Sequence, residues 1–116
     1  MKKTLFAITV SLVLGFIACS KKTSPGKTAE VPKVTYAVEV QPLIQARCSP
    51  CHLPSKGGNK ANFETYASAK NFGQDILVRV NLNPGQRGFM PFKHPKLTEQ
   101  EIAVFKKWID DGLLEK

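Results

Sequence analysis

The pentapeptide Cys48-Ser49-Pro50-Cys51-His52 limits the possible folds of this chain more than any other segment. Because only two residues separate the cysteines, the segment brings two thiols and an imidazole into one turn. The chain has 116 residues, and a domain of this size often depends on a metal, a disulfide or a cofactor for part of its stability. We therefore expect the rest of the domain to fold around this segment.

The spacing of these side chains is typical of covalent haem attachment. Two thiols at the end of a helix can each add to one of the vinyl groups on adjacent haem pyrroles, and the next residue then lies under the iron. We expect one covalently bound haem c on Cys48 and Cys51, with His52 as the proximal iron ligand.

Three other interpretations of the pentapeptide stay open: a redox-active dithiol, a structural disulfide and half of a zinc site. A thioredoxin-like dithiol belongs in a βαβ context, which this sequence lacks. A zinc site with four protein ligands would need Cys48, Cys51, His52 and His94 together. With zinc or a disulfide the protein would be a colourless structural module.

Residues 1–18 have the plan of a signal peptide, with lysines at positions 2 and 3 before an apolar run from Leu5 to Ala18. The run of about fourteen residues is short for a membrane-spanning helix, which needs roughly twenty. We therefore expect export of the chain without a retained transmembrane anchor.

The segment Phe16-Ile17-Ala18-Cys19 resembles the bacterial lipobox. Lipidation of Cys19 would hold the protein at the periplasmic side of a bacterial membrane, since each buried methylene adds roughly 0.8 kcal/mol of membrane affinity. The alternative is ordinary cleavage after Ser20, which would leave a soluble periplasmic protein.

The formal net charge of +8 comes from 17 basic and 9 acidic residues, and much of the excess lies in residues 20–34. Their small, polar and proline residues indicate a linker. Because the basic residues are not interleaved with aromatics on one element, nucleic acid is not the expected partner. We divide the chain into a signal peptide at 1–18, a lipidated N-terminus and linker at 19–34, and one domain at 35–116.

Apolar periodicity predicts a helix between Tyr36 and Arg47. Proline is tolerated only in the first turn of a helix, because it lacks the amide proton that an interior position donates. Pro42 therefore indicates that the helix begins near Val40 or Gln41.

The C-terminal segment has the clearest helix signals. Thr98 precedes Glu101 by three positions, as in a capping box, and Gly112 supplies a stop. The apolar residues of the predicted inner face are Ile102, Phe105, Trp108 and Ile109.

The middle of the domain has weaker helical patterns at 63–71 and 74–80, whereas 81–91 contains proline and glycine and is predicted to be an extended loop. No segment alternates as a strand would. The predicted fold class is all-α.

Three motifs occur in order along the chain: Cys48–His52, Met90-Pro91 and Trp108-Ile109-Asp110-Asp111-Gly112. With them, residues 35–116 resemble the small class I c-type cytochrome domains of bacterial exported proteins. The resemblance implies a small helical domain around one haem, in which the N- and C-terminal helices cross. It also implies Met90 as the distal iron ligand, and a thioether there favours the ferrous state.

His94 is the competing distal ligand, and it would give a bis-histidine haem of lower potential. Many relatives have a Gly-Pro after the histidine, and its proline carbonyl accepts the other ring proton of the proximal histidine. This chain has Gly57-Gly58 and no such proline, so the acceptor stays open.

The resemblance also suggests which side chains surround the haem. The expected lining residues are Phe63, Leu82, Phe89 and Phe92. The candidate partners of the haem propionates are Tyr66, Arg79, Arg87 and Trp108. The lysines that flank the ligand segments and that could steer an acidic partner are Lys56, Lys60, Lys93 and Lys96.

The function implied by the resemblance is one-electron transfer rather than enzymatic catalysis. The partners would be redox proteins of the periplasm or membrane. The alternative is a haem enzyme or gas-sensing domain, in which the distal site is open or ligated by His94.

Overall fold

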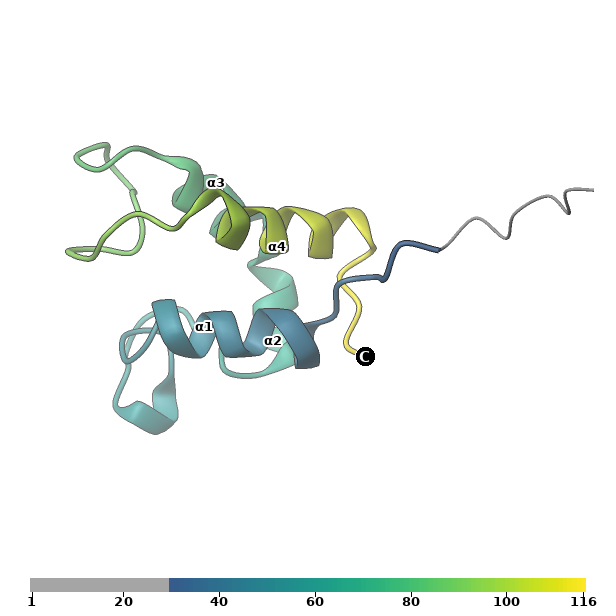
Figure 1. Ribbon diagram of the computed structural model, residues 1–116. Helices are drawn as coiled ribbons and strands as arrows, with labels where there is room; N and C mark the ends of the chain where they lie inside the picture. Colours follow the sequence, from purple (N-terminus) through teal and green to yellow (C-terminus); the bar gives the residue numbers. More distant parts are fainter. Residues whose placement is uncertain (1–29) are drawn as a thin grey trace, which may run out of the picture. The chain divides into compact units, whose positions relative to one another are not determined.

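The computed structural model describes residues 30–116, so the predicted signal peptide, Cys19 and most of the linker lie outside the described residues. The described part is helical, which confirms the predicted all-α class. Its helical elements, drawn in Figure 1, are η1 (Tyr36–Val40), α1 (Gln41–Arg47), η2 (Pro54–Lys56), α2 (Tyr66–Asn71), α3 (Gly73–Asn81) and α4 (Glu99–Asp110).

The first helix has two parts. The α-helical part begins at Gln41 and carries Pro42 in its first turn, as predicted. It is preceded by a π-helical turn, η1, in which the Gln41 amide donates to the carbonyl of Tyr36. The sequence did not indicate this turn, although Tyr36 and Val40 are buried on the predicted apolar face.

Helix α4 begins and ends where the sequence predicts. The Thr98 hydroxyl accepts from the Glu101 amide at 3.2 Å, and the Glu101 carboxylate accepts from the Thr98 amide at 2.8 Å, which completes the capping box. Gly112 follows the helix with a φ of +96°, a left-handed conformation that favours glycine. Phe105 and Trp108 are completely buried on its inner face.

The first and last helical segments pack against each other. The ring centroids of Tyr36 and Trp108 are 6.0 Å apart. The carbonyl of Leu114 accepts from the Tyr36 amide at 2.8 Å and from the Trp108 indole Nε1 at 2.8 Å. One backbone carbonyl therefore joins the two ends of the domain.

The middle helices differ slightly from the prediction. Helix α2 begins at Tyr66 because the Thr65 hydroxyl caps it, accepting from the Ser68 amide at 3.4 Å. Helix α3 includes Asn81, which was predicted to be in the loop. Figure 1 shows α3 beside α4. A Cβ at Gly73 would lie 2.9 Å from Leu113 Cδ2, in the segment that follows α4.

Two long connections leave the helices at the same end of the domain, at the left in Figure 1. One runs from the end of α1 to α2 and contains the CxxCH segment; the other joins α3 to α4. Between them lies the cavity described below. No helix within residues 30–116 is both long and apolar enough to cross a bilayer.

Candidate functional site

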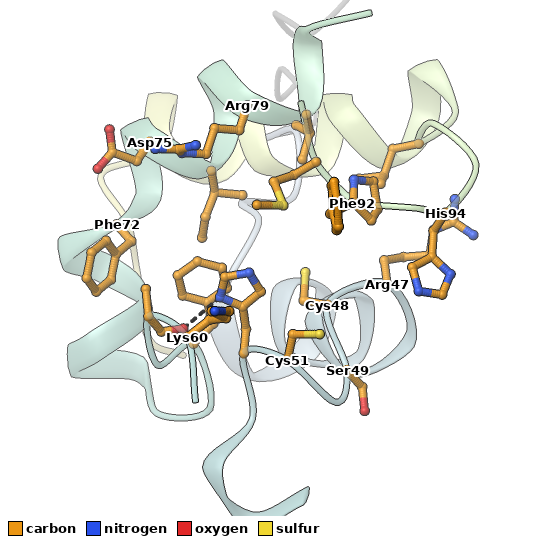
Figure 2. Close-up of a pocket in the computed structure, with 18 residues that line it drawn as sticks. Arg47, Cys48, Ser49, Cys51, Lys60, Phe72, Asp75, Arg79, Phe92 and His94 are labelled. Carbon is orange, nitrogen blue, oxygen red and sulfur yellow. Dashed lines mark hydrogen bonds between the residues drawn. The ribbon is translucent and has the colours of Figure 1, made fainter. Parts of the chain in front are cut away.

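The candidate site is a cavity of about 390 Å³ between the two long connections. Cys48, Cys51, His52 and Met90 all line it, although the last of these lies far along the chain from the others. In Figure 2, Cys48 and Cys51 lie across the cavity from Arg79. The structure therefore brings together the four residues that the sequence assigned to one site.

The CxxCH segment continues directly from α1. Cys48 caps the helix, and its amide donates to the carbonyl of Ile44 at 2.8 Å. The carbonyl of Cys48 in turn accepts from the His52 amide at 3.1 Å. This turn places two free thiols, that of the half-buried Cys48 and that of the exposed Cys51, at the cavity.

The two thiols have different surroundings. Burial raises the pKa of the Cys48 thiol to about 11, and the nearby charge of Arg47 offsets this only in part. Reactive redox cysteines have lowered pKa values, because the thiolate is the nucleophile. The surroundings of Cys48 therefore do not favour a redox-active dithiol.

The imidazole of His52 is held on two sides. Its Nδ1 lies 2.7 Å from the carbonyl oxygen of Ala61. Because a carbonyl can only accept, Nδ1 carries the proton and Nε2 of the neutral ring keeps its lone pair. The ring also stacks on Phe63, with centroids 4.1 Å apart and planes 3° apart. Ala61 therefore occupies the acceptor role that the sequence left open.

The loop that carries Ala61 folds back onto the CxxCH turn. The Lys60 amide donates to the carbonyl of Cys51 at 3.1 Å, and the Phe63 amide donates to that of His52 at 3.0 Å. Gly58 makes this approach possible, since a Cβ there would collide with the carbonyl oxygen of Pro50 and lie 2.6 Å from that of Cys51.

Met90 reaches the cavity from the opposite connection. Its amide donates to the carbonyl of Arg79, near the end of α3, at 3.2 Å. The Arg79 guanidinium donates to the carbonyl of Gly88 at 3.4 Å. Met90 is half-buried, whereas His94 is exposed but also lines the cavity. The structure thus leaves both predicted distal ligands at the site.

The apolar lining agrees in part with the expectation. Phe63 and Phe92 line the cavity, whereas Phe89 lines a neighbouring hollow and Leu82 lines neither. The sequence did not indicate the apolar contribution of α3 and of the residue before it. The missed residues are Phe72, Ile76 and Val80, and their spacing of four is the signal that could have found them.

The candidate propionate partners do not all lie at the cavity. The Tyr66 hydroxyl donates to the carbonyl of Leu113 at 2.9 Å, and the Trp108 indole donates to that of Leu114, so both contribute to the packing of the C-terminus instead. Arg79 does line the cavity. The cavity lining also includes Arg47 and Lys60, and Arg87 lines the neighbouring hollow.

The four residues of the hypothetical zinc site do not meet as a cluster. Within residues 30–116, no group of three or more His, Cys, Asp or Glu side chains is close enough to hold a metal ion. A zinc interpretation would need two cysteines and two histidines in contact with one ion. The described geometry gives no support to that interpretation.

Neither protein-family models, curated proteins nor solved structures gave a match to this chain.

Proposed function

We propose that this chain is an exported one-electron carrier with a single haem c, attached through Cys48 and Cys51 and ligated by His52 and Met90. The observation that supports the proposal best is the hydrogen bond from His52 Nδ1 to Ala61 at 2.7 Å. It leaves Nε2 of a cavity-lining imidazole with a free lone pair, in a cavity that a thioether also lines.

The side chains at the cavity suit a haem. Two free thiols, an imidazole that donates through Nδ1 and a thioether would hold a haem, the thiols as attachment points and the other two as iron ligands. The cavity volume of about 390 Å³ lies within the usual range for cofactor sites. Its walls include Ile76, Val80 and Leu97, which are apolar and buried. A bound haem supplies reversible one-electron oxidation and reduction of iron.

Each residue has a separate role in this proposal. The carbonyl of Ala61 polarises the imidazole of His52 by accepting a hydrogen bond from Nδ1, which would make Nε2 a stronger iron ligand. Met90 favours the ferrous state, because a thioether is a soft ligand. Phe63 supports the His52 ring by stacking on it and helps exclude water from the iron.

The optical spectrum of the haem-loaded protein tests the axial ligands. We expect the ferric wild type to show the weak thioether-to-iron band at the red end of its spectrum, and Met90→Ala to lose it. His94→Ala is the matched control, since it changes the competing ligand at the same cavity. If instead His94→Ala alone changes the axial ligation, the haem is bis-histidine.

An open distal site is the second candidate function, because His94 is exposed at the same cavity and could serve a haem enzyme or gas sensor. Carbon monoxide binding separates the two functions. A carrier with both axial positions filled does not bind the gas in its reduced wild-type form, whereas a sensor does.

The proposal includes redox proteins of the periplasm or membrane as partners. Phe92 lines the cavity and is 66% exposed, with Lys93 Nζ 5.3 Å from its ring centroid. Residues 82–98 contain no Asp or Glu, so an acidic partner surface suits this face. Lys96 instead donates to the carbonyl of Asn81 at 3.2 Å and closes the base of the loop.

The proposed location is the periplasmic side of a bacterial membrane, with a lipid anchor on Cys19. We expect Cys19→Ser to move the protein from the membrane fraction to the soluble fraction, because the acyl chains supply the membrane affinity. Ser20→Ala is the control and leaves the protein in the membrane fraction. A wild-type protein found only in the soluble fraction would instead support cleavage after Ser20.

A further inference from the structure

A second pair of residues closes the loop that carries Ala61. The carboxylate of Glu64 accepts from the Ser55 amide at 3.0 Å and from the Ser55 hydroxyl. We call this pair the Ser55–Glu64 clasp. The Glu64 amide also donates to the side-chain oxygen of Asn62 at 2.7 Å, so the carboxylate projects from an ordered turn.

The clasp encloses the acceptor of the proximal histidine. Ala61 lies between Ser55 and Glu64, in a segment with no regular secondary structure after η2. The bonds from Lys60 to Cys51 and from Phe63 to His52 attach this segment to the CxxCH turn. The clasp joins Ser55 at the start of the loop to Glu64 at its end. The carbonyl of Ala61 therefore lies in a segment that is anchored on both sides.

The residue beside Glu64 contributes to the same arrangement. Phe63 stacks on the His52 ring, and its carbonyl accepts from the buried hydroxyl of Tyr36 at 3.0 Å. Glu64 therefore directly follows a residue that is held in place by the His52 ring and the Tyr36 hydroxyl. Its partner Ser55 lies in η2, and the bond between them sets the shape of the exposed part of the loop.

We propose that the Ser55–Glu64 clasp positions His52: by closing the loop, it fixes the hydrogen bond from His52 Nδ1 to Ala61 and so tunes the reduction potential of the iron. This inference rests on the proposed function, in which His52 is an axial ligand. Ser55 and Glu64 are positioning residues, since they act on His52 through Ala61.

The direction of the effect follows from ligand chemistry. An imidazole that donates a strong hydrogen bond through Nδ1 has more negative charge on Nε2 and stabilises ferric iron more. Opening the clasp lets Ala61 move and weakens this bond. The reduction potential should then rise, and the Nδ1 proton should exchange with solvent more readily.

Two substitutions in the haem-loaded full chain separate the effect of the clasp on the position of His52 from the effect of the Glu64 charge. Glu64→Gln weakens the clasp, because glutamine keeps only one acceptor oxygen, but it also removes a negative charge, which by itself raises the potential. Ser55→Ala weakens the clasp without any change of charge. Ser55→Thr keeps the hydroxyl and should restore wild-type behaviour, and Glu115→Gln removes an exposed carboxylate far along the chain from the loop.

The readouts are the midpoint potential and the exchange rate of the His52 Nδ1 proton, followed by NMR. We expect both Ser55→Ala and Glu64→Gln to raise the potential and to speed exchange by about tenfold, the effect of losing roughly one net hydrogen bond. Ser55→Thr and Glu115→Gln should keep the wild-type exchange rate.

Two results would overturn the inference while leaving the proposed function intact. One is a Ser55→Ala protein with wild-type potential and exchange. The other is a potential shift in Glu64→Gln alone with unchanged exchange, which assigns the effect to charge. A wild-type chain that takes up no haem is a distinct result, because it overturns the proposed function and the role of the clasp together.

Discussion

Gly58 is the residue at which the CxxCH turn and the following loop approach most closely. A side chain there would collide with the carbonyl oxygens of Pro50 and Cys51. These atoms are backbone, so they cannot move aside as a flexible side chain would. The close approach is also what brings Ala61 within hydrogen-bonding distance of His52.

We predict that Gly58→Ala lowers the free energy of unfolding by about 1–3 kcal/mol, the usual effect of forcing extra atoms into a packed site. Gly57→Asn is the control: Gly57 has a φ of +82° with no atom near its absent Cβ, and asparagine tolerates that conformation. Urea unfolding of both variants checks this. A Gly58→Ala protein as stable as the wild type would contradict the described approach.

The residue whose carbonyl accepts from His52 Nδ1 could not be identified from the sequence. Ala61 acts through its backbone carbonyl, so its side chain carries no signal of the role. The resemblance implied an acceptor for a proximal histidine, and the sequence lacks the proline that supplies it in many relatives. Which carbonyl replaces it depends on how the loop folds back at Gly58.

Among the helical elements, α4 is the one whose limits were predicted most fully, because side chains mark both of its ends. Thr98 and Glu101 form the capping box, and Gly112 follows the last turn. The carboxylate oxygen Oε1 of Glu101 also lies 3.4 Å from Nε of Arg47, the last residue of α1. The start of α4 is thus tied to the helix that leads into the CxxCH turn.

Loss of the cap should destabilise the domain. We expect Thr98→Ala to lower the free energy of unfolding by about 1 kcal/mol, since the Glu101 amide loses its acceptor. Thr98→Ser keeps a hydroxyl and should retain nearly all of the stability. Denaturant midpoints of the two variants provide the measurement, and equal midpoints would show that the cap is not stabilising.

The other elements were predicted less fully, for identifiable reasons. Helix α2 begins at Tyr66 rather than at Phe63, because Thr65 caps it. Phe63 instead stacks on His52 in the preceding loop. The π-helical turn of η1 has the same buried residues as an α-helix would, so periodicity did not separate the two. The middle helices have no capping box to mark their ends.

At the scale of the whole domain, Asp111 joins the two ends of the described chain. Its carboxylate accepts from the Val34 amide at 2.6 Å and pairs with Lys107 at 2.8 Å. The Lys107 hydrogen bond, and then that of Val34, hold the pKa of Asp111 below its ordinary value of 3.8. Hydrogen bonds from Ser55 likewise lower the pKa of Glu64 from 4.5.

These shifts predict acid destabilisation. A carboxyl group whose pKa is lower in the folded state stabilises the fold above its unfolded pKa, and this contribution is lost as the pH falls through the folded value. We therefore expect the free energy of unfolding to fall below about pH 4, as acidic groups of this kind become protonated.

The pH dependence can be assigned to Asp111 with a neighbouring control. Asp111→Asn should flatten the acid limb of the stability curve measured by denaturant unfolding. Asp110→Asn should leave it nearly unchanged, because the Asp110 side chain is 58% exposed, against 14% for Asp111, and exposed pairs contribute little. Equal curves for the two variants would contradict the assignment.

At the scale of the whole molecule, the sequence predicted only part of the cavity lining. The motifs indicated that residues near 48–52 and 90 meet, and the structure places them at one cavity. The wall formed by Ile76 and Val80 was not predicted, because α3 contains none of the recognised motifs. Its position depends on packing against α4, which lies outside the reach of local patterns.

Covalent haem attachment and one-electron transfer are both tested by a reductive titration of the purified, haem-matured chain, with its intact mass measured beforehand. We expect a mass increase of one haem that survives acid and organic solvent, followed by a single reversible one-electron optical transition. A colourless chain, or haem that is extracted from the protein, would contradict covalent attachment through Cys48 and Cys51.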